Sequence, residues 1–504
     1  MQKMISWVLL VVMLVLGLGA GYAEDAGTAA AQFVMAGFDD ESANHDWSTN
    51  LFFQRMQEKT GVSFAFEQYA NETAWKQTKQ TILAGGDDMP DVLFKAALSQ
   101  DEQLQGHANG TLIDLRPYLE QYAPTLWAML QENPDWLATI SLPDGAIVAL
   151  PLINQLQNNN AMWINKTWLD NLGLAMPTTA EELVDVLLAF KTGDPNQNGK
   201  KDEIPMTFTG LWDLRFLGHA FGLVSNDYYI TMDEQGQVST ILNTDENRAF
   251  LTWLHQLWTE GLLDDTGFSS LDSSRRITDS DATITYGMFL SPTPMNMVPA
   301  DAMNDYALLQ PLTYNGQQIY RDFAGDLVCG TFAITSACED PAALISWVDY
   351  LYTEEGCYLM QAGQEGEDFV WNGDGTWEWV YDANTVASTV LTENTISDGG
   401  AAPGLASVDF QLRYDDSATR VVISDLVQLK SLCVTPYPTV WLDDATWSRV
   451  NELQMDLGLY AEQQMVWFVA GDIPLNDETW SDFCQTLETK GLNEMLTIWQ
   501  DAVK

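Results

Sequence analysis

Basic residues are scarce in this sequence. Only 22 Lys and Arg stand against 71 Asp and Glu in 504 residues, which gives a formal net charge of -49. Nucleic acids and anionic membranes bind basic protein surfaces, so we expect neither of them as a partner. Salt screens charges beyond roughly 8 to 10 Å, and the net charge therefore leaves open an anionic ligand in a locally basic pocket.

The sequence also lacks the motifs of several enzymes and metal sites. No HExxH zinc motif and no GxSxG nucleophile motif occurs, and the four histidines are scattered. The five cysteines lie in the last third of the chain without a CxxC pair, which indicates buried free thiols over a disulfide scaffold or a zinc site. Paired carboxylates suit a glycosidase, but among 71 acidic residues such pairing carries no information.

A long apolar run occurs only at the N-terminus. Lys3 precedes an apolar run from about Ile5 to Leu18, and small residues follow up to Ala23. This layout is typical of a secretory signal cleaved after Ala23, and no later stretch approaches the roughly 20 apolar residues of a spanning helix. We therefore expect an exported protein with a signal peptide over residues 1–23.

What the sequence does contain is an alternation of strand and helix patterns, which favours α/β layers. Strand, helix and strand are predicted in turn at 33–38, 51–62 and 64–69. Longer amphipathic helices are predicted at 179–192, at about 245–261 and at about 340–356. With 46% apolar residues, a chain of this length can bury at least two cores, so we expect two lobes.

The stretch TGDPNQNGKKDEIP, at residues 192–205, gathers oxygen-bearing side chains directly after a predicted helix. A phosphate-binding loop does not fit, because five residues separate its glycines where four are required and no Ser or Thr follows the lysine. Its acidic side chains add to the partial negative charge of the helix end, which a bound cation would relieve.

A calcium loop fits the same stretch better. Positions 1, 3, 5, 7 and 9 of such a loop correspond to Asp194, Asn196, Asn198, the carbonyl of Lys200, and Asp202. Pro205 stands at position 12 in place of the usual Glu, and Glu203 is the available substitute. The residues alone leave two interpretations open, a Ca²⁺ site and a solvated Asn-Gly turn.

Several stretches together resemble the extracellular solute-binding proteins of ABC transporters, in the branch that includes lipoprotein-type and alginate-binding members. They are QEKTGVSF, ILAGGDDMPDVLF, GTLIDLRPYLEQYAP, LPDGAIVALP, INKTWLDNLGLAMPTTAEEL, GTFAITSACEDPAALISWVDYLYTEEG and FVAGDIPLNDETWSDF. Their order and spacing, which cover nearly the whole mature chain, make the resemblance specific.

The resemblance implies a type II periplasmic-binding-protein fold, in which two α/β lobes joined by crossing strands close on a ligand. Crossings are expected near 148–152 and 309–313. Lobe 1 would comprise 24–150 plus 312–365, and lobe 2 would comprise 151–311 plus 366–504.

The same resemblance implies a function and a cofactor. We expect a binding protein, not an enzyme, that delivers a carbohydrate, as a monomer, to an ABC permease. A structural Ca²⁺ would be bound outside the ligand cleft by Asp194, Asn196, Asn198, Lys200, Asp202 and Glu203. Many members carry a lipidated Cys after the signal, whereas the first Cys here is Cys329, so lipid anchoring is not expected. The alternatives are an exported glycoside-active enzyme, a binding protein for another solute such as a peptide, and a calcium-stabilised surface module.

Loop-like stretches supply the candidate ligand contacts. Sugar rings stack on aromatic planes, and the proposed stacking residues are Trp47, Trp212, Phe289 and Trp441. The proposed hydroxyl acceptors are Asp39, Asp87 and Asp322. Ordinary core packing is the alternative for each aromatic residue, and a solvated turn is the alternative for each aspartate.

Overall fold

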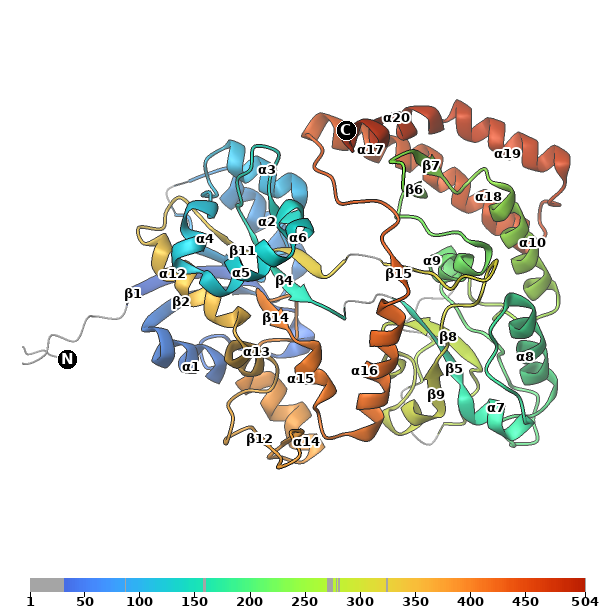
Figure 1. The fold of residues 1–504 in the computed structure, drawn as a ribbon, viewed down its shortest axis with the longest axis horizontal. Coiled ribbons are helices and arrows are strands. Elements are labelled where there is room, and N and C mark those ends of the chain that lie inside the picture. Colours follow the sequence, from blue (N-terminus) through green and yellow to red (C-terminus); the bar gives the residue numbers. More distant parts are fainter. Residues whose placement is uncertain are drawn as a thin grey trace, which may run out of the picture.

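Two α/β lobes lie side by side in the computed structural model (Figure 1). The structure describes residues 31–86, 88–156, 160–269, 275–277, 279, 282–322 and 325–503. The largest buried apolar cluster contains second-lobe residues, and another large cluster contains first-lobe residues, so each lobe has its own core. Among the described residues, no helix has the length and apolar character needed to cross a membrane.

The first lobe is built on a six-stranded sheet with the order β14-β4-β11-β3-β1-β2. The strands are β1 (Ala31–Phe38), β2 (Val62–Tyr69), β3 (Val92–Phe94), β4 (Leu150–Asn154), β11 (Leu327–Ile334) and β14 (Gly404–Ala406). β1 pairs in parallel with both β2 and β3, and β11 is antiparallel to β3 and β4. In Figure 1 the carboxyl end of β1 points toward the second lobe, so the loops that follow the parallel strands face the interlobe region.

The predicted strand, helix and strand at the start of the first lobe are confirmed. Helix α1 (Leu51–Thr60) joins β1 to β2, Asn50 accepts the backbone N–H of Phe52 at its start, and Gly61 ends it in a left-handed conformation. The other helices of this lobe are α2 (Glu72–Leu83), α3 (Gln100–Ala108), α4 (Arg116–Tyr122), α5 (Pro124–Glu132), α6 (Pro134–Ile140), α12 (Pro341–Asp349), α13 (Glu354–Gln361), α14 (Ala383–Thr385) and α15 (Val408–Leu412).

The single helix predicted at 340–356 is wrong. Asp340 caps α12 at the predicted start, but the helix stops at Asp349 and a 3-10 turn follows. Thr353 then caps the new helix α13, and Gly356 lies inside it. A Cβ at Gly356 would lie 1.9 Å from the carbonyl oxygen of Tyr350, so this glycine serves a close backbone approach and does not end a helix.

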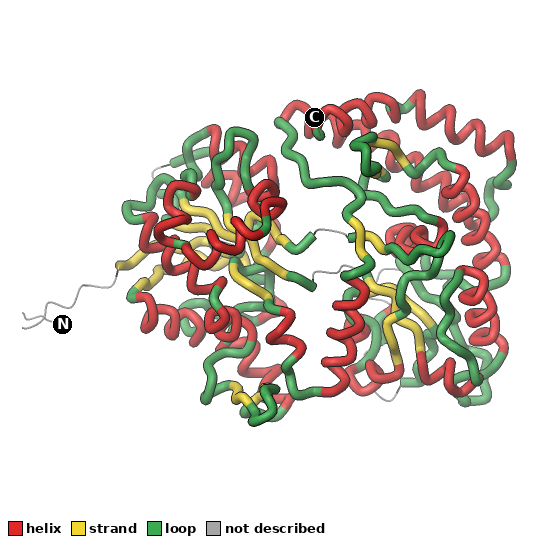
Figure 2. Tube along the Cα trace, in the orientation of Figure 1, coloured by secondary structure: helices red, strands yellow, loops and turns green. Residues whose placement is uncertain are grey.

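The second lobe has a three-stranded sheet in which β5 (Ala161–Asn165) lies between β8 (Met288–Ser291) and β9 (Tyr306–Leu308). Short pairs join β6 (Ile230–Met232) to β7 (Val238–Thr240) and β10 (Tyr320–Arg321) to β15 (Cys433–Val434). Helices are far more extensive than strands in this lobe, as Figure 2 shows. They are α7 (Lys166–Leu172), α8 (Ala180–Thr192), α9 (Gly210–Leu214), α10 (Asp245–Thr259), α16 (Ser417–Lys430), α17 (Asp444–Leu453), α18 (Leu459–Ala470), α19 (Asp477–Thr489) and α20 (Leu492–Ala502).

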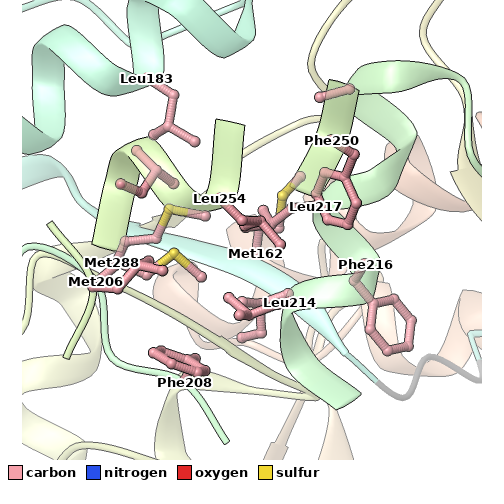
Figure 3. Packing of buried hydrophobic residues seen from close by; sticks show 14 of the residues in the cluster. Met162, Leu183, Met206, Phe208, Leu214, Phe216, Leu217, Phe250, Leu254 and Met288 are labelled. Atoms are coloured by element: carbon pink, nitrogen blue, oxygen red, sulfur yellow. The ribbon is translucent and has the colours of Figure 1, made fainter. Parts of the chain in front are cut away.

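The helices predicted at 179–192 and 245–261 are confirmed as α8 and α10. Their apolar faces meet the sheet in the core of this lobe, where Figure 3 shows Leu183 of α8 and Leu254 of α10 with Met162 of β5. All three side chains are at most 1% exposed. Truncating such a residue to Ala costs about 2 to 5 kcal/mol in the free energy of unfolding, so this core contributes strongly to the stability of the second lobe.

The described segments of the chain pass from one lobe to the other after β4, between β10 and β11, and between α15 and α16. The first crossing begins just beyond the predicted 148–152. The last of those residues belong to β4, which stays paired with β11 in the first-lobe sheet up to Ile153. The second prediction, 309–313, is wrong. The backbone N–H of Leu312 donates to His219 Nε2 at 2.9 Å and that of Thr313 to the Thr178 carbonyl at 2.7 Å, which fixes this segment within the second lobe.

The predicted lobe boundary at residue 365 also needs correction. Beyond it, strands β12 (Phe369–Trp371) and β13 (Trp377–Trp379) form a hairpin whose aromatic side chains pack with Cys357 of α13. Strand β14 then pairs with β4 in the first-lobe sheet. Residues 366–412 therefore belong to the first lobe, and the second lobe resumes at α16.

Candidate functional site

A cavity of about 570 Å³ lies between the two lobes beside the second crossing. Short helix α6 lines it from the first lobe, and the crossing, α16 and the segment 435–439 line it from the other side. The charged and aromatic side chains that line it are those of Asp135, Trp136, Asp322, Asp326, Lys430 and Tyr437. We call this space the interlobe cleft.

Two further cavities also have walls from both lobes. One, of about 510 Å³, lies between residues 104–108 and 142–144 of the first lobe and residues 442–445 of the second. The other, of about 600 Å³, lies between residues 99–101 and residues 447–451. The space between the lobes is therefore larger than the cleft alone, and the C-terminal segment 435–451 lines all three cavities.

Lys430 is held by two carboxylates at the wall of the cleft. Its Nζ lies 3.0 Å from Asp322 Oδ2 and 3.2 Å from Asp326 Oδ1. Burial lowers the pKa of Lys430, but the hydrogen bonds and charges of the two aspartates outweigh burial, and the net effect is a raised pKa. Lys430 therefore stays protonated, and both aspartates keep oxygen atoms near the cavity.

Trp212 lies on the surface of the second lobe close to the first crossing. The neighbouring Asp213 accepts a hydrogen bond of 2.7 Å from Asn160, which begins the second lobe after that crossing. Trp212 is 44% exposed, and the guanidinium of Arg215 stacks on its ring at 3.7 Å from the centroid. This cation–π contact orients the ring while leaving much of it accessible, as a stacking platform requires.

The guanidinium of Arg215 is also paired with a carboxylate. Its Nη2 lies 2.5 Å from Asp227 Oδ1, and Arg321 shares the same oxygen at 2.9 Å. Burial and the charge of Arg321 lower the pKa of Arg215 to about 10, which still leaves the guanidinium protonated at neutral pH.

Trp47 and Phe289, which the sequence suggested as stacking residues, lie in cores. Trp47 is fully buried in the first lobe, with ring centroids 5.5 Å from Phe94 and 5.7 Å from Phe53. Phe289 is 1% exposed and packs on Tyr306 at 4.7 Å. The stacking prediction is wrong for both residues, because each ring is enclosed by its own lobe.

Trp441 reaches across from the second lobe. It is partly buried and packs against the first-lobe cluster that contains Trp75 and Leu142, and its Nε1 is buried without a hydrogen-bond partner. The ring therefore forms part of the contact between the lobes, and its proposed role in stacking on a ligand stays a prediction.

The three proposed hydroxyl acceptors have different surroundings. Asp39 is 1% exposed, and its Oδ2 accepts from His45 at 2.9 Å, Trp47 at 2.7 Å and Lys95 at 3.0 Å. It belongs to a buried structural network, so the prediction of a ligand contact is wrong. Asp87 lies outside the described residues. Asp322 lines the cleft, where the prediction placed it.

Sequence reasoning missed Trp136, Asp326 and Lys430, all of which line the cleft. Trp136 follows a Pro-Asp pair at the start of a seven-residue helix, and part of its ring packs on the first-lobe core. From sequence alone, an aromatic residue on a short helix is expected to pack in a core. Only its position at the lobe boundary distinguishes Trp136 from a core residue.

The loop after α8 has the hydrogen bonds of a preformed cation loop. The carboxylate of Asp194 accepts the backbone N–H groups of Asn198 and Gly199 at 3.1 to 3.3 Å. The side-chain amides of Asn196 and Asn198 both donate to Asp202 at 3.1 Å. Four of the predicted ligand residues therefore converge, although no cluster of three or more His, Cys, Asp or Glu side chains suited to a metal occurs among the described residues.

Glu203, the predicted substitute for the missing position-12 ligand, shows whether the residues of this loop suit a bound cation. Its Oε1 is buried without a hydrogen-bond partner. Burial raises the pKa of Glu203, and the charges of Asp202 and Asp194 raise it further. A carboxylate oxygen that is buried, unpartnered and next to two other carboxylates suits a hard cation such as Ca²⁺.

The chain is similar to known solute-binding proteins along most of its length. FusA, a fructooligosaccharide ABC transporter substrate-binding protein of Streptococcus pneumoniae, is 26% identical over 477 residues, which are 90% of this chain and 87% of that protein. The structure of FusA in complex with kestose has a TM-score of 0.72 at 24% identity and covers 93% of this chain and 98% of that one. An extracellular solute-binding protein of Bifidobacterium longum subsp. infantis has a TM-score of 0.78 at 21% identity, covering 94% and 97%.

The names of two similar structures refer to an EF-hand or to calcium. FusA has also been solved as an EF-hand mutant. An alginate-binding protein solved without calcium ion has a TM-score of 0.65 at 19% identity, covering 94% of this chain and 98% of that one.

The likeness to these solved structures confirms the predicted two-lobed periplasmic-binding fold.

The sequence pattern of the bacterial extracellular solute-binding proteins matches residues 33–356, which is more than half of the chain. Members of this family bind a solute, and the expectation of a binding protein in place of an enzyme agrees with that. The chain belongs to the family of bacterial extracellular solute-binding proteins.

Proposed function

We propose that this protein captures an oligosaccharide between its lobes and delivers it to the permease of an ABC transporter. The observation that carries the proposal is the cleft of about 570 Å³ with walls from both lobes, which is lined by Trp136 and by three aspartates. A sugar presents C–H faces that suit an aromatic ring and hydroxyl groups that donate to carboxylates. The fructooligosaccharide binding named for FusA supports the same class of ligand.

A thermal-shift screen of the purified protein against mono- and oligosaccharides tests this proposal. A ligand that binds only the folded state at a hundredfold excess over its Kd adds roughly 2.7 kcal/mol of stability, enough to raise the melting temperature by several degrees. We expect oligosaccharides to raise it and amino acids or short peptides to leave it unchanged. A shift produced by peptides and by no sugar would contradict the proposal.

We further propose that the loop at 194–203 binds one structural Ca²⁺, with side-chain oxygens of Asp194, Asn196, Asn198, Asp202 and Glu203 and the carbonyl of Lys200 as ligands. The asparagine amides would turn their oxygens inward when the ion binds. The ion would neutralise the carboxylates that gather beyond the end of α8 and so fix this loop.

Chelation tests the calcium proposal. EDTA should lower the melting temperature of the wild-type protein and leave that of Asp194→Ala/Asp202→Ala unchanged. Asp233→Ala is a matched control, because Asp233 also accepts backbone N–H groups in an exposed turn of the second lobe. That variant should respond to EDTA as the wild type does, and a wild-type protein insensitive to EDTA would leave only a turn.

We also propose that residues 1–23 direct export and that the mature protein carries no lipid. The support is the sequence pattern of charge, apolar run and small residues that ends at Ala23. Mass spectrometry of natively expressed protein should find either an N-terminus near Glu24 or an intact signal, in both cases without an acyl chain, and a diacylglycerol adduct would overturn the proposal.

A further inference from the structure

The arginine and lysine side chains near the cleft are bound to carboxylates of the protein. Lys430 contacts both Asp322 and Asp326. Arg215 and Arg321 share Asp227. A ligand carboxylate would have to compete with these pairs for each cation, at a cost in ion-pair energy that a hydroxyl group does not incur.

The charged side chains that line the three interlobe cavities are predominantly acidic. Among their described lining residues, three aspartates and Lys430 line the cleft, two aspartates line the second cavity, and one aspartate lines the third. Within the part of the chain that the structure describes, Lys430 is the one Lys or Arg that lines them. A negatively charged ligand would therefore meet like charge along the whole space between the lobes.

The same walls suit an uncharged sugar. Trp136 lines the cleft and Trp447 lines the third cavity, so aromatic surface is available for C–H faces. Asp322 and Asp326 each use one oxygen on Lys430, and a carboxylate accepts about four hydrogen bonds in all, which leaves capacity for ligand hydroxyls. Paired to Lys430, the two carboxylates are also fixed in position before a ligand arrives.

We infer that the cleft selects neutral oligosaccharides and rejects oligomers of uronic acids. This inference rests on the proposed function and adds to it the charge class of the ligand. The selection is local, because it comes from the paired cations and the acidic walls. It therefore persists at high ionic strength, where the field of the net charge of -49 is screened.

Calorimetric titration of the full-length mature protein with two matched series tests the inference. The series are neutral fructan-type and glucan-type oligosaccharides and oligogalacturonates of the same lengths, at physiological and at high ionic strength. Like-charge contacts across an interface are strongly unfavourable, so we expect the uronates to bind roughly 100-fold or more weaker than the best neutral sugar at both salt concentrations. Uronate binding equal to or tighter than neutral binding would overturn the inference and uphold the carbohydrate function. Absence of binding in both series would overturn the two together.

A variant tests the residues behind the selection. Asp322→Asn/Asp326→Asn leaves Lys430 without its carboxylates, so it should raise uronate affinity by roughly tenfold, the effect of one charge-assisted contact. Asp456→Asn removes a comparable exposed lysine partner, that of Lys490, outside the cavities and should leave both series unchanged. Melting curves verify that each variant is folded. Uronate affinity that stays as low in the cleft variant as in wild type would contradict the role assigned to these two aspartates.

Discussion

His219 allows the energetics of the second lobe to be tested with a single titrating group. The residue is 1% exposed and both ring nitrogens are occupied. Nδ1 lies 2.6 Å from the carbonyl oxygen of Phe216, and the backbone N–H of Leu312 donates to Nε2 at 2.9 Å. Because Nε2 must be unprotonated to accept, the ring is neutral, with its proton on Nδ1 donated to Phe216. Burial lowers the pKa of His219 to about 4, against a smaller opposing effect of the Phe216 hydrogen bond.

The sign and size of the effect follow from this lowered pKa. As the pH falls below 6.5, a histidine in the unfolded chain takes up a proton, while His219 in the folded protein stays neutral down to about pH 4. The unfolded state therefore binds more protons in this window, and stability is lost as the pH falls through it. One pKa unit corresponds to about 1.4 kcal/mol, so the loss amounts to roughly 3 kcal/mol near pH 4.

Urea unfolding of the wild type and of His219→Gln across this pH range measures the contribution. Glutamine keeps a donor and an acceptor but does not titrate, and the carboxylates and other histidines titrate alike in both proteins. We expect the stability advantage of the wild type over the variant to shrink by roughly 3 kcal/mol between neutral pH and about pH 4. Parallel pH profiles would refute the argument, because His219 would then titrate equally in both states.

Two further predictions concern the first lobe and the ligand. Asp39→Asn should cost about 3 to 5 kcal/mol in urea unfolding, because it leaves the buried ammonium of Lys95 without its carboxylate. Asp39→Asn/Lys95→Met should recover much of that loss, and a double variant less stable than the single one would contradict the pairing. Trp212→Ala should weaken binding of a screened sugar by about 1 to 3 kcal/mol, by analogy with base stacking, with little change in melting temperature. Trp47→Ala should instead cost about 3 to 5 kcal/mol of stability, and the reverse pattern would contradict the placement of the two rings.

Local order was predictable because its causes are local. The α1 helix begins after Asn50 and ends at Gly61, and both signals are visible in the sequence. Amphipathic periodicity placed α8 and α10 to within a few residues, and Thr179 and Thr244 cap them. The convergence of side chains in the loop from Asp194 to Asp202 was also predictable, because these residues are close together in the sequence.

The positions of the crossings and the ligand contacts were less predictable, because they depend on contacts between distant segments. The stretch around Trp47 is polar, but its Asp39 and His45 hydrogen-bond within the lobe, so the ring is buried despite its neighbours. The hairpin near Trp377 joins the first lobe through stacking on Phe410, with ring centroids 4.5 Å apart. No local signal distinguishes these aromatic residues from the accessible Trp212.

A crystal structure with the tightest oligosaccharide from the screen would show whether a sugar binds between the lobes. We expect density for the sugar in the cleft of about 570 Å³, in contact with Trp136 of the first lobe and with Asp322 or Asp326 on the other wall. A sugar bound on the outer surface of one lobe, with the cleft empty, would contradict the proposed function.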